Sequence, residues 1–190
     1  FSESADWQNK VVLGNGWAYG AEFFLQKKYG KTTGWIGYTL AWNKRQFDEL
    51  NFGRVFPFKY DRRHDVSVVL THEFSKKIDC GLVWVYGTGN ATTMPVGSYQ
   101  AFYPPDVTSG YPTIVDQVGP RNGYRMRPYH RLDLSINFNK ERKNWSETWS
   151  LAFYNAYSRR NPYFLYFDYD YVHDKRVLKQ VSLFPIIPSI

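Results

Sequence analysis

The chain has 190 residues, a net charge of +7 and 19% aromatic residues, an unusual share for a sequence whose mean hydropathy is −0.52. No run of about 18 apolar residues is present, which excludes a transmembrane helix. The single cysteine, Cys80, excludes an internal disulfide framework and a thiolate metal cage. Basic residues are spread from Lys10 to Lys179, so the charge alone does not choose between nucleic acid, an acidic lipid surface and an anionic ligand.

Alternation of apolar and polar residues predicts a series of β-strands, each roughly ten residues long, which is the length that a tilted strand needs to cross a bilayer. In chain order we expect them at residues 17–28, 33–44, 63–74, 80–89, 128–139, 146–157 and 177–190. The alternation is clearest in 128–139. There, one side carries Leu132, Leu134, Ile136 and Phe138, and the other carries Arg131, Asp133, Ser135 and Asn137.

The connections between these strands alternate between short and long. Residues 29–32, 75–79 and 140–145 are short turns, whereas 45–62, 90–127 and 158–176 are long. Outer-membrane β-barrels have short periplasmic turns and long external loops, and their strands face lipid on one side and a polar interior on the other. A soluble sandwich has no reason to sort its loops by length, whereas a soluble antiparallel barrel, which also alternates, stays open as the alternative. The pattern therefore favours an all-β, transmembrane antiparallel β-barrel with the long loops outside.

Four segments support a more specific assignment. They are "WNKRQFDELNFGRVFPFKYDRRHDVSVV", "YRMRPYHRLDLSINF", "SLAFYNAYSRRNPYFLYFD" and "KQVSLFPIIPSI". In this order they resemble the C-terminal barrel region of TonB-dependent outer-membrane receptors of the Bacteroidetes type, and the resemblance extends over about residues 7–190.

The resemblance implies a barrel of about 22 strands with a plugged lumen. Residues 1–190 would be the last seven or so strands, an incomplete domain whose N-terminal barrel strands and plug lie outside this chain. It further implies a Gram-negative outer-membrane location and contacts with membrane lipid and lipopolysaccharide. The implied partners are the TonB complex, reached through the missing plug, and a surface lipoprotein. The function would be active uptake of a scarce nutrient, with iron chelate, cobalamin, glycan and peptide all open as cargo.

Two groups of residues are candidates for functional roles. In "KYDRRHD", Lys59, Arg62 and Arg63 could attract anionic cargo, or pair with Asp61 and Asp65 and fix the point where a long loop returns to a strand. We favour this loop-anchoring role. In the loop 90–127, aromatic residues could stack on a ligand or fold the loop onto itself. The best candidates there for contact with substrate are Tyr103, Tyr111 and Arg121.

The sequence gives little support to an enzyme. His72 and Glu73 are adjacent on a predicted strand and therefore point to opposite faces, and no H-E-x-x-H, G-x-S-x-G or phosphate-loop motif is present. We expect no catalytic residue, no cofactor and no metal site. The alternative function is a soluble basic, aromatic β-domain that binds single-stranded nucleic acid by stacking. It is disfavoured because the rings share faces with Leu, Ile and Val, so we expect no nucleic-acid partner.

Overall fold

The computed structural model describes residues 11–101 and 113–190. Over these ranges the chain is all-β, with antiparallel pairing throughout and a 3-10 turn, η2 (Asn51–Gly53). Among the described residues, no helix has the length and apolar character that crossing a membrane would require.

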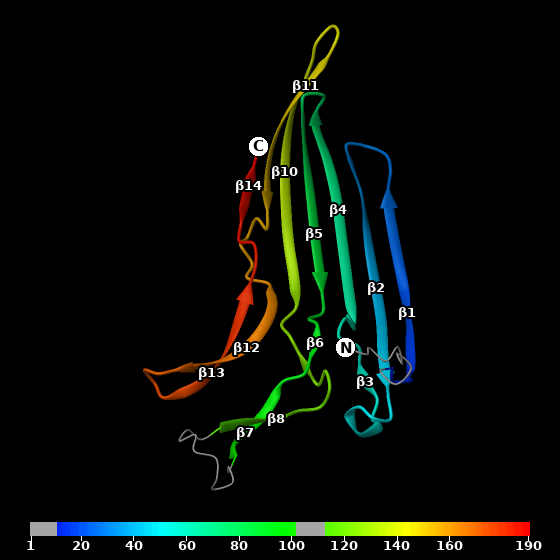
Figure 1. Ribbon diagram of the computed structural model, residues 1–190. Coiled ribbons are helices and arrows are strands. Elements are labelled where there is room, and N and C mark those ends of the chain that lie inside the picture. Colours follow the sequence, from blue (N-terminus) through cyan, green and yellow to red (C-terminus); the bar gives the residue numbers. More distant parts are fainter. Residues whose placement is uncertain (1–10, 102–112) are drawn as a thin grey trace, which may run out of the picture. The chain divides into compact units, whose positions relative to one another are not determined.

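The main sheet follows the path β1-β2-β4-β5-β10-β11-β14 (Figure 1). These strands are β1 (Asn15–Lys27), β2 (Thr32–Gln46), β4 (His64–Ser75), β5 (Ile78–Gly87), β10 (Tyr129–Glu141), β11 (Ser146–Tyr154) and β14 (Ile187–Ser189). The short strand β3 (Phe56–Pro57) pairs with β2 beside this path. Three further two-stranded sheets pair β6 (Ala91–Thr92) with β9 (Tyr124–Arg125), β7 (Pro95–Ala101) with β8 (Thr113–Val118), and β12 (Pro162–Asp170) with β13 (Lys175–Ser182).

The first six predicted strands are confirmed, with ends that shift by up to three residues. The seventh prediction, one strand over 177–190, is wrong. Strand β13 pairs with β12 in a separate hairpin, and only β14 joins the main sheet, beside β11. The break contains Phe184, whose φ is 52°, and Pro185, which has no N–H to donate to a ladder. The predicted loop 158–176 accordingly contains β12, a strand that the prediction missed.

The alternation of short and long connections is also present in the structure. Tight turns join β1 to β2, β4 to β5 and β10 to β11, whereas the connections from β2 to β4, β5 to β10 and β11 to β14 are long and contain the small strands. Because successive strands of the path are antiparallel neighbours, the tight turns leave one end of the sheet and the long connections leave the other.

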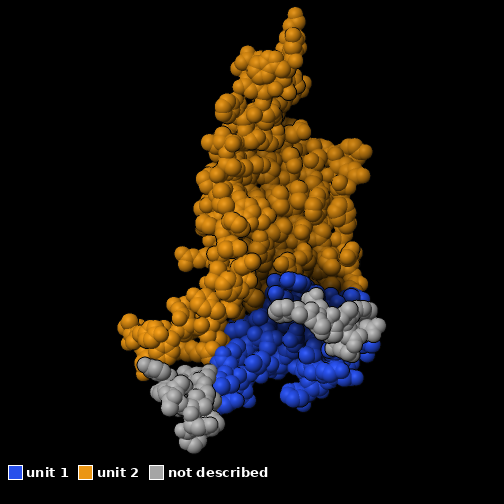
Figure 2. All heavy atoms as spheres, in the orientation of Figure 1, with its two compact units in different colours: residues 1–19, 42–61, 90–125 blue, residues 20–41, 62–89, 126–190 orange. Residues whose placement is uncertain are grey.

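The chain divides into two compact units, which Figure 2 colours separately. Unit 1 comprises residues 1–19, 42–61 and 90–125, and therefore holds most of the first two long connections. Unit 2 comprises residues 20–41, 62–89 and 126–190, and holds most of the main sheet together with the β12–β13 hairpin.

Within unit 2 the main sheet has one apolar face. Side chains of paired residues on neighbouring strands lie on the same face, so the register defines rows across the sheet. One row joins Leu70 of β4, Leu82 of β5 and Leu134 of β10, and Leu134 is paired in turn with Phe153 of β11. Adjacent rows add Ile36, Val68, Trp84, Leu132, Ile136, Leu151, Phe138 and Trp149.

The opposite face is polar on β10, although the rows that it forms with its neighbours also contain Trp35, Val69 and Val83. Arg131 and Asp133, which alternate with Leu132 and Leu134 on β10, form an ion pair at 2.9 Å. Farther along β10, Asp79 of β5 accepts hydrogen bonds at 2.6 Å from the side-chain amides of both Asn137 and Asn139. Strand β10 is therefore amphipathic, as the alternation in its sequence predicts.

Buried side chains are few in the described residues, and half of them are polar. The apolar ones are Phe56, Ala91 and Met126, and the polar ones are Asp61, Asn155 and Asn161. A single sheet without a second layer leaves most of its apolar side chains partly exposed. The three buried polar side chains all lie where long connections meet strands, and they anchor those connections.

Candidate functional site in the long connections

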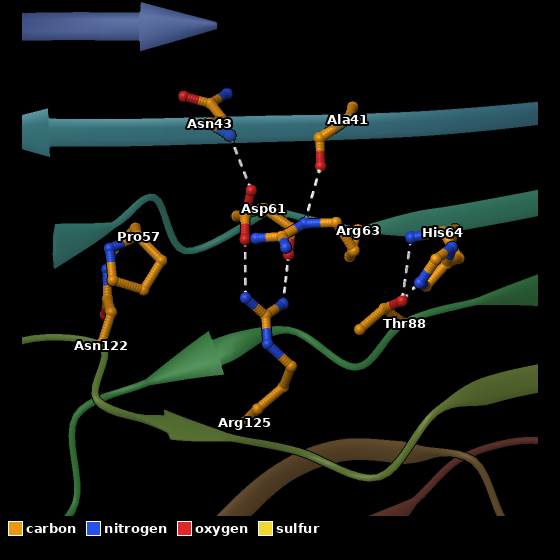
Figure 3. Close-up of polar contacts among 9 residues, drawn as sticks. All are labelled: Ala41, Asn43, Pro57, Asp61, Arg63, His64, Thr88, Asn122 and Arg125. Atoms are coloured by element: carbon orange, nitrogen blue, oxygen red, sulfur yellow. Dashed lines mark hydrogen bonds and ion pairs between the residues drawn. The ribbon is translucent and has the colours of Figure 1, made fainter. Parts of the chain in front are cut away.

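Asp61 is the buried carboxylate of unit 1, with 3% of its surface exposed. Its Oδ1 accepts a hydrogen bond at 2.6 Å from the backbone N–H of Asn43 in β2, and its Oδ2 pairs with Nη2 of Arg125 in β9 at 2.6 Å (Figure 3). Arg125 Nη1 also donates to the backbone carbonyl of Asp61. One carboxylate thus joins the end of a main-sheet strand to both long connections of unit 1.

The sequence singled out Asp61 but not its partner. Arg125 lies 64 positions away, beyond the second long connection, and no local pattern links the two residues. A buried carboxylate needs a counter-charge or several donors, so the burial of Asp61 requires a partner of this kind.

The other charged residues of "KYDRRHD" make weaker contacts within unit 2. Arg62 faces Asp65 at 3.4 Å, and both side chains are substantially exposed. Arg63 donates from Nε to the carbonyl of Ala41 at 3.2 Å, and so fastens the start of β4 to β2 (Figure 3). All four predicted anchoring residues therefore contact other residues, but Asp61 alone among them is buried.

A second set of contacts joins the two long connections of unit 1 directly. The side-chain amide of Asn122 donates to the carbonyl of Pro57 at 2.9 Å, while its backbone N–H donates to Thr93 Oγ1 at 2.9 Å. The backbone N–H of Arg121 donates to Asn51 Oδ1 at 3.0 Å. These contacts bring Arg121, a predicted substrate-contacting residue, next to the turn η2.

The turn η2 has unusual backbone geometry. Asn51, Phe52 and Gly53 have φ values of 56°, 58° and 68°, in the left-handed region that costs a residue with a side chain about 1–2 kcal/mol. Phe52 is nevertheless an aromatic residue, and 93% of its surface is exposed. Strained backbone of this kind persists only where surrounding contacts hold it, and it is concentrated at functional sites.

A hollow of about 500 Å³ lies beside this turn in unit 1. Its lining comes from the η2 segment, from Thr93 and Val96 and from the residues at the end of β8. The charged side chains in the lining are Glu49, Arg54 and Arg121. Sequence reasoning identified Arg121 but missed Phe52 and Arg54, although the "NFG" sequence, with its glycine, was an available turn signal. Tyr103 and Tyr111 lie outside the described residues.

In unit 2, Asn155 anchors the third long connection. It follows β11, is 1% exposed and has a φ of 53°. Its side-chain amide donates at 3.0 Å to the carbonyls of both Arg159 and Phe184, and its Oδ1 accepts from the N–H of Arg159 at 2.9 Å. Asp133 in turn accepts from the N–H of Asn155 at 2.9 Å. The single side chain of Asn155 thus fixes both ends of the β12–β13 insertion.

Asn161 secures the start of the same insertion. Its Oδ1 accepts a hydrogen bond from the backbone N–H of His130 at 3.0 Å, and its Nδ2 donates to the His130 carbonyl at 2.9 Å. The side-chain amide therefore satisfies the two backbone groups that a neighbouring β-strand would bind. The His130 ring is hydrogen-bonded to the Tyr157 hydroxyl at 2.8 Å. Burial raises the pKa of the Tyr157 phenol.

Among the described residues, no three His, Cys, Asp or Glu side chains come together in a way that could hold a metal ion. The arrangement consists of anchored loops, an exposed ring and a hollow with charged walls, which are features of a binding surface. In comparisons with known proteins, no family model matches the chain, and neither a curated protein nor a solved structure matches it.

Proposed function

We propose that the chain is the C-terminal part of the β-barrel of a TonB-dependent transporter in a Gram-negative outer membrane. In this role it forms barrel wall and external loops for the uptake of a scarce nutrient. The observation that carries the proposal is the continuous apolar face of the main sheet, which runs over β2, β4, β5, β10 and β11.

Several side chains of the apolar face are well exposed. Leu134 is 38% exposed, Phe138 46% and Trp149 62%, and their neighbours in the rows are also apolar. Soluble monomers rarely expose a contiguous apolar patch of more than a few hundred Å². Lipid chains would cover this face without needing a second protein layer.

The polar face supports the same function. Arg131, Asp133, Asp79 and the asparagines of β10 are hydrogen-bonded or ion-paired across it. Such a face suits the wet or protein-filled interior of a large barrel, and it would be costly against hydrocarbon. The alternation of tight turns and long connections agrees with the periplasmic turns and external loops of such barrels.

The edge strands of the main sheet could each pair with a further strand. Its path ends at β1, which has 13 residues, and at the three-residue β14. A long unpaired strand edge such as that of β1 favours aggregation unless another strand pairs with it. In the proposed function, upstream strands of the same transporter pair with these edges, a plug fills the lumen, and the TonB complex acts through that plug. Lipopolysaccharide and a surface lipoprotein are the expected neighbours outside.

The experiment expresses the transporter that contains this chain in a Gram-negative host and separates the cell fractions. We expect residues 1–190 in the outer-membrane fraction, resistant to carbonate extraction and soluble only in detergent. A folded monomer of these residues that needs no detergent would refute the proposal, and it would favour the soluble nucleic-acid-binding alternative.

A further inference from the structure

The hollow beside η2 combines a ring, positive charge and an apolar wall. We propose that it binds an organic anion in which a carboxylate is attached to a flat aromatic ring. The proposed function implies that the hollow opens to the cell exterior. The ligand chemistry is inferred separately, from the residues of unit 1 that line the hollow.

Phe52 provides the surface for the ring. A phenylalanine that is 93% exposed gains nothing from burial, and its left-handed φ of 58° disfavours a residue with a side chain. If η2 served only to turn the chain, glycine or asparagine would be favoured at position 52. An aromatic ligand that stacks on Phe52 would give this ring a role, because offset stacking is favourable beyond the area that it buries.

Arg54 and Arg121 provide the positive charge in the lining, and the Asn51 side chain binds the backbone of both residues. The Asn51 side chain accepts from the backbone N–H of Arg121 at 3.0 Å and donates to the backbone carbonyl of Arg54 at 3.3 Å. Within the described ranges, neither guanidinium forms an ion pair. Because a guanidinium presents donors in a fork that matches a carboxylate, the two arginines suit an anionic group.

The rest of the lining sets the size and polarity of the ligand. The apolar side chains are Leu50, Phe52, Val96, Val118 and Pro120, and the volume of about 500 Å³ falls in the range of small-molecule sites. Glu49 is the single acidic residue in the lining, so positive charge exceeds negative charge there. A ring-bearing monocarboxylate matches this combination better than a sugar, which offers neither a flat ring nor a charge.

The test measures ligand affinity by calorimetry on the detergent-solubilised transporter that contains this chain. The probes are 2-naphthoate, the uncharged 2-naphthamide, and octanoate, which has the carboxylate but no ring. We expect naphthoate to bind most tightly. The variants Arg54→Gln and Arg121→Gln should each weaken naphthoate by about tenfold or more, the effect of losing a hydrogen bond to a charged group.

The variant Phe52→Leu should weaken naphthoate by about two- to tenfold and leave octanoate unchanged, because leucine keeps the apolar contact but loses stacking. The matched control is Lys143→Gln, which removes a positive charge from the tight turn between β10 and β11, distant in sequence from the lining. It should leave every affinity unchanged. Equal affinity for naphthoate and naphthamide, or wild-type affinity in the arginine variants, would overturn the inference. If the same preparations assembled correctly in the outer membrane, the ligand inference would be wrong while the proposed barrel function would still hold.

Discussion

Asp61 and Arg125 form an ion pair at 2.6 Å across 64 residues of chain, and Asp61 is almost fully buried. The same carboxylate accepts from the N–H of Asn43. This ion pair links the first two long connections. Asp65, four residues later, belongs to the same charged segment but pairs with Arg62 at 3.4 Å in an exposed position.

Replacing Asp61 with Asn should therefore loosen the long connections. We expect a loss of about 1–3 kcal/mol, since Arg125 would keep its charge and lose its ionised partner. Limited proteolysis of the intact protein should show faster cleavage within residues 45–62 and 90–127. Asp65→Asn is the control and should cost less than about 1 kcal/mol. Equal protease resistance in the two variants would argue against an anchoring role for Asp61.

The Asn155 side chain should be essential for positioning the β12–β13 hairpin. Asn155→Gly and Asn155→Ala both remove its hydrogen bonds, which should cost at least about 2 kcal/mol because buried groups lose their partners. Alanine should be worse by about 1 kcal/mol, because its Cβ opposes the φ of 53°. Denaturant titration in detergent checks both values. If alanine proved as stable as glycine, the backbone strain assigned to this position would be wrong.

The two faces of β10 should respond differently to a charge. Leu134→Arg, on the apolar face, should cost about 2–4 kcal/mol near the middle of a bilayer. Ser135→Arg, one residue later on the polar face, should assemble nearly normally, because paired Gly81 and Ala152 leave room for the longer side chain. Heat resistance of the folded form during electrophoresis reports assembly. Normal assembly of Leu134→Arg would count strongly against a lipid-facing surface.

The long connections should be accessible from outside the cell. In a Cys80→Ser background, Ser98→Cys lies in β7 within the longest connection, and Lys143→Cys lies in a tight turn. A thiol reagent that does not cross the outer membrane should label Ser98→Cys on intact cells. It should reach Lys143→Cys only after the cells are broken. The opposite labelling pattern would invert the topology and remove the hollow from the cell exterior.

The β12–β13 hairpin should carry a pH-dependent contribution from Asp168 and Lys179. Lys179 donates to Asp168 at 2.5 Å, and this hydrogen bond lowers the pKa of Asp168 and raises the pKa of Lys179. The contribution is therefore complete between the ordinary pKa values of about 3.9 and about 10.4. It is lost as pH falls through the depressed pKa of Asp168, or rises through the raised pKa of Lys179.

Amide hydrogen exchange in the hairpin measures this contribution. The difference in protection between the wild type and Lys179→Gln should be greatest near neutral pH and should shrink toward pH 2–3, below the ordinary pKa of an aspartate of about 3.9. Lys175→Gln, in the same hairpin, is the control and should not produce this difference. A difference that persists unchanged in acid would show that the lysine acts by packing instead of by charge.

The sequence by itself determined the amphipathic strands. Alternation with period two, as in Leu132, Asp133 and Leu134, is a local property, and it predicted six strands, their tight turns and the apolar face before any contact was known. It failed at residues 158–190, where "PYFLYFDYD" has the composition of a strand and pairs with β13 in a separate hairpin, while only β14 joins the main sheet. Which segment joins β11 depends on the break at Pro185, which is local, and on the hydrogen bond from Asn155 to the carbonyl of Phe184, which is a tertiary contact.

Only the tertiary structure decided the candidate site. The pairing of Asp61 with Arg125 joins residues far apart in sequence, so no local pattern specifies it. The hollow likewise needs Asn51 and Arg121 side by side, from two different long connections. The physical reason is that the alternation of apolar and polar residues along a strand reflects the two faces of its own sheet. The conformation of a loop depends instead on which distant groups pair with its buried charges and its backbone donors.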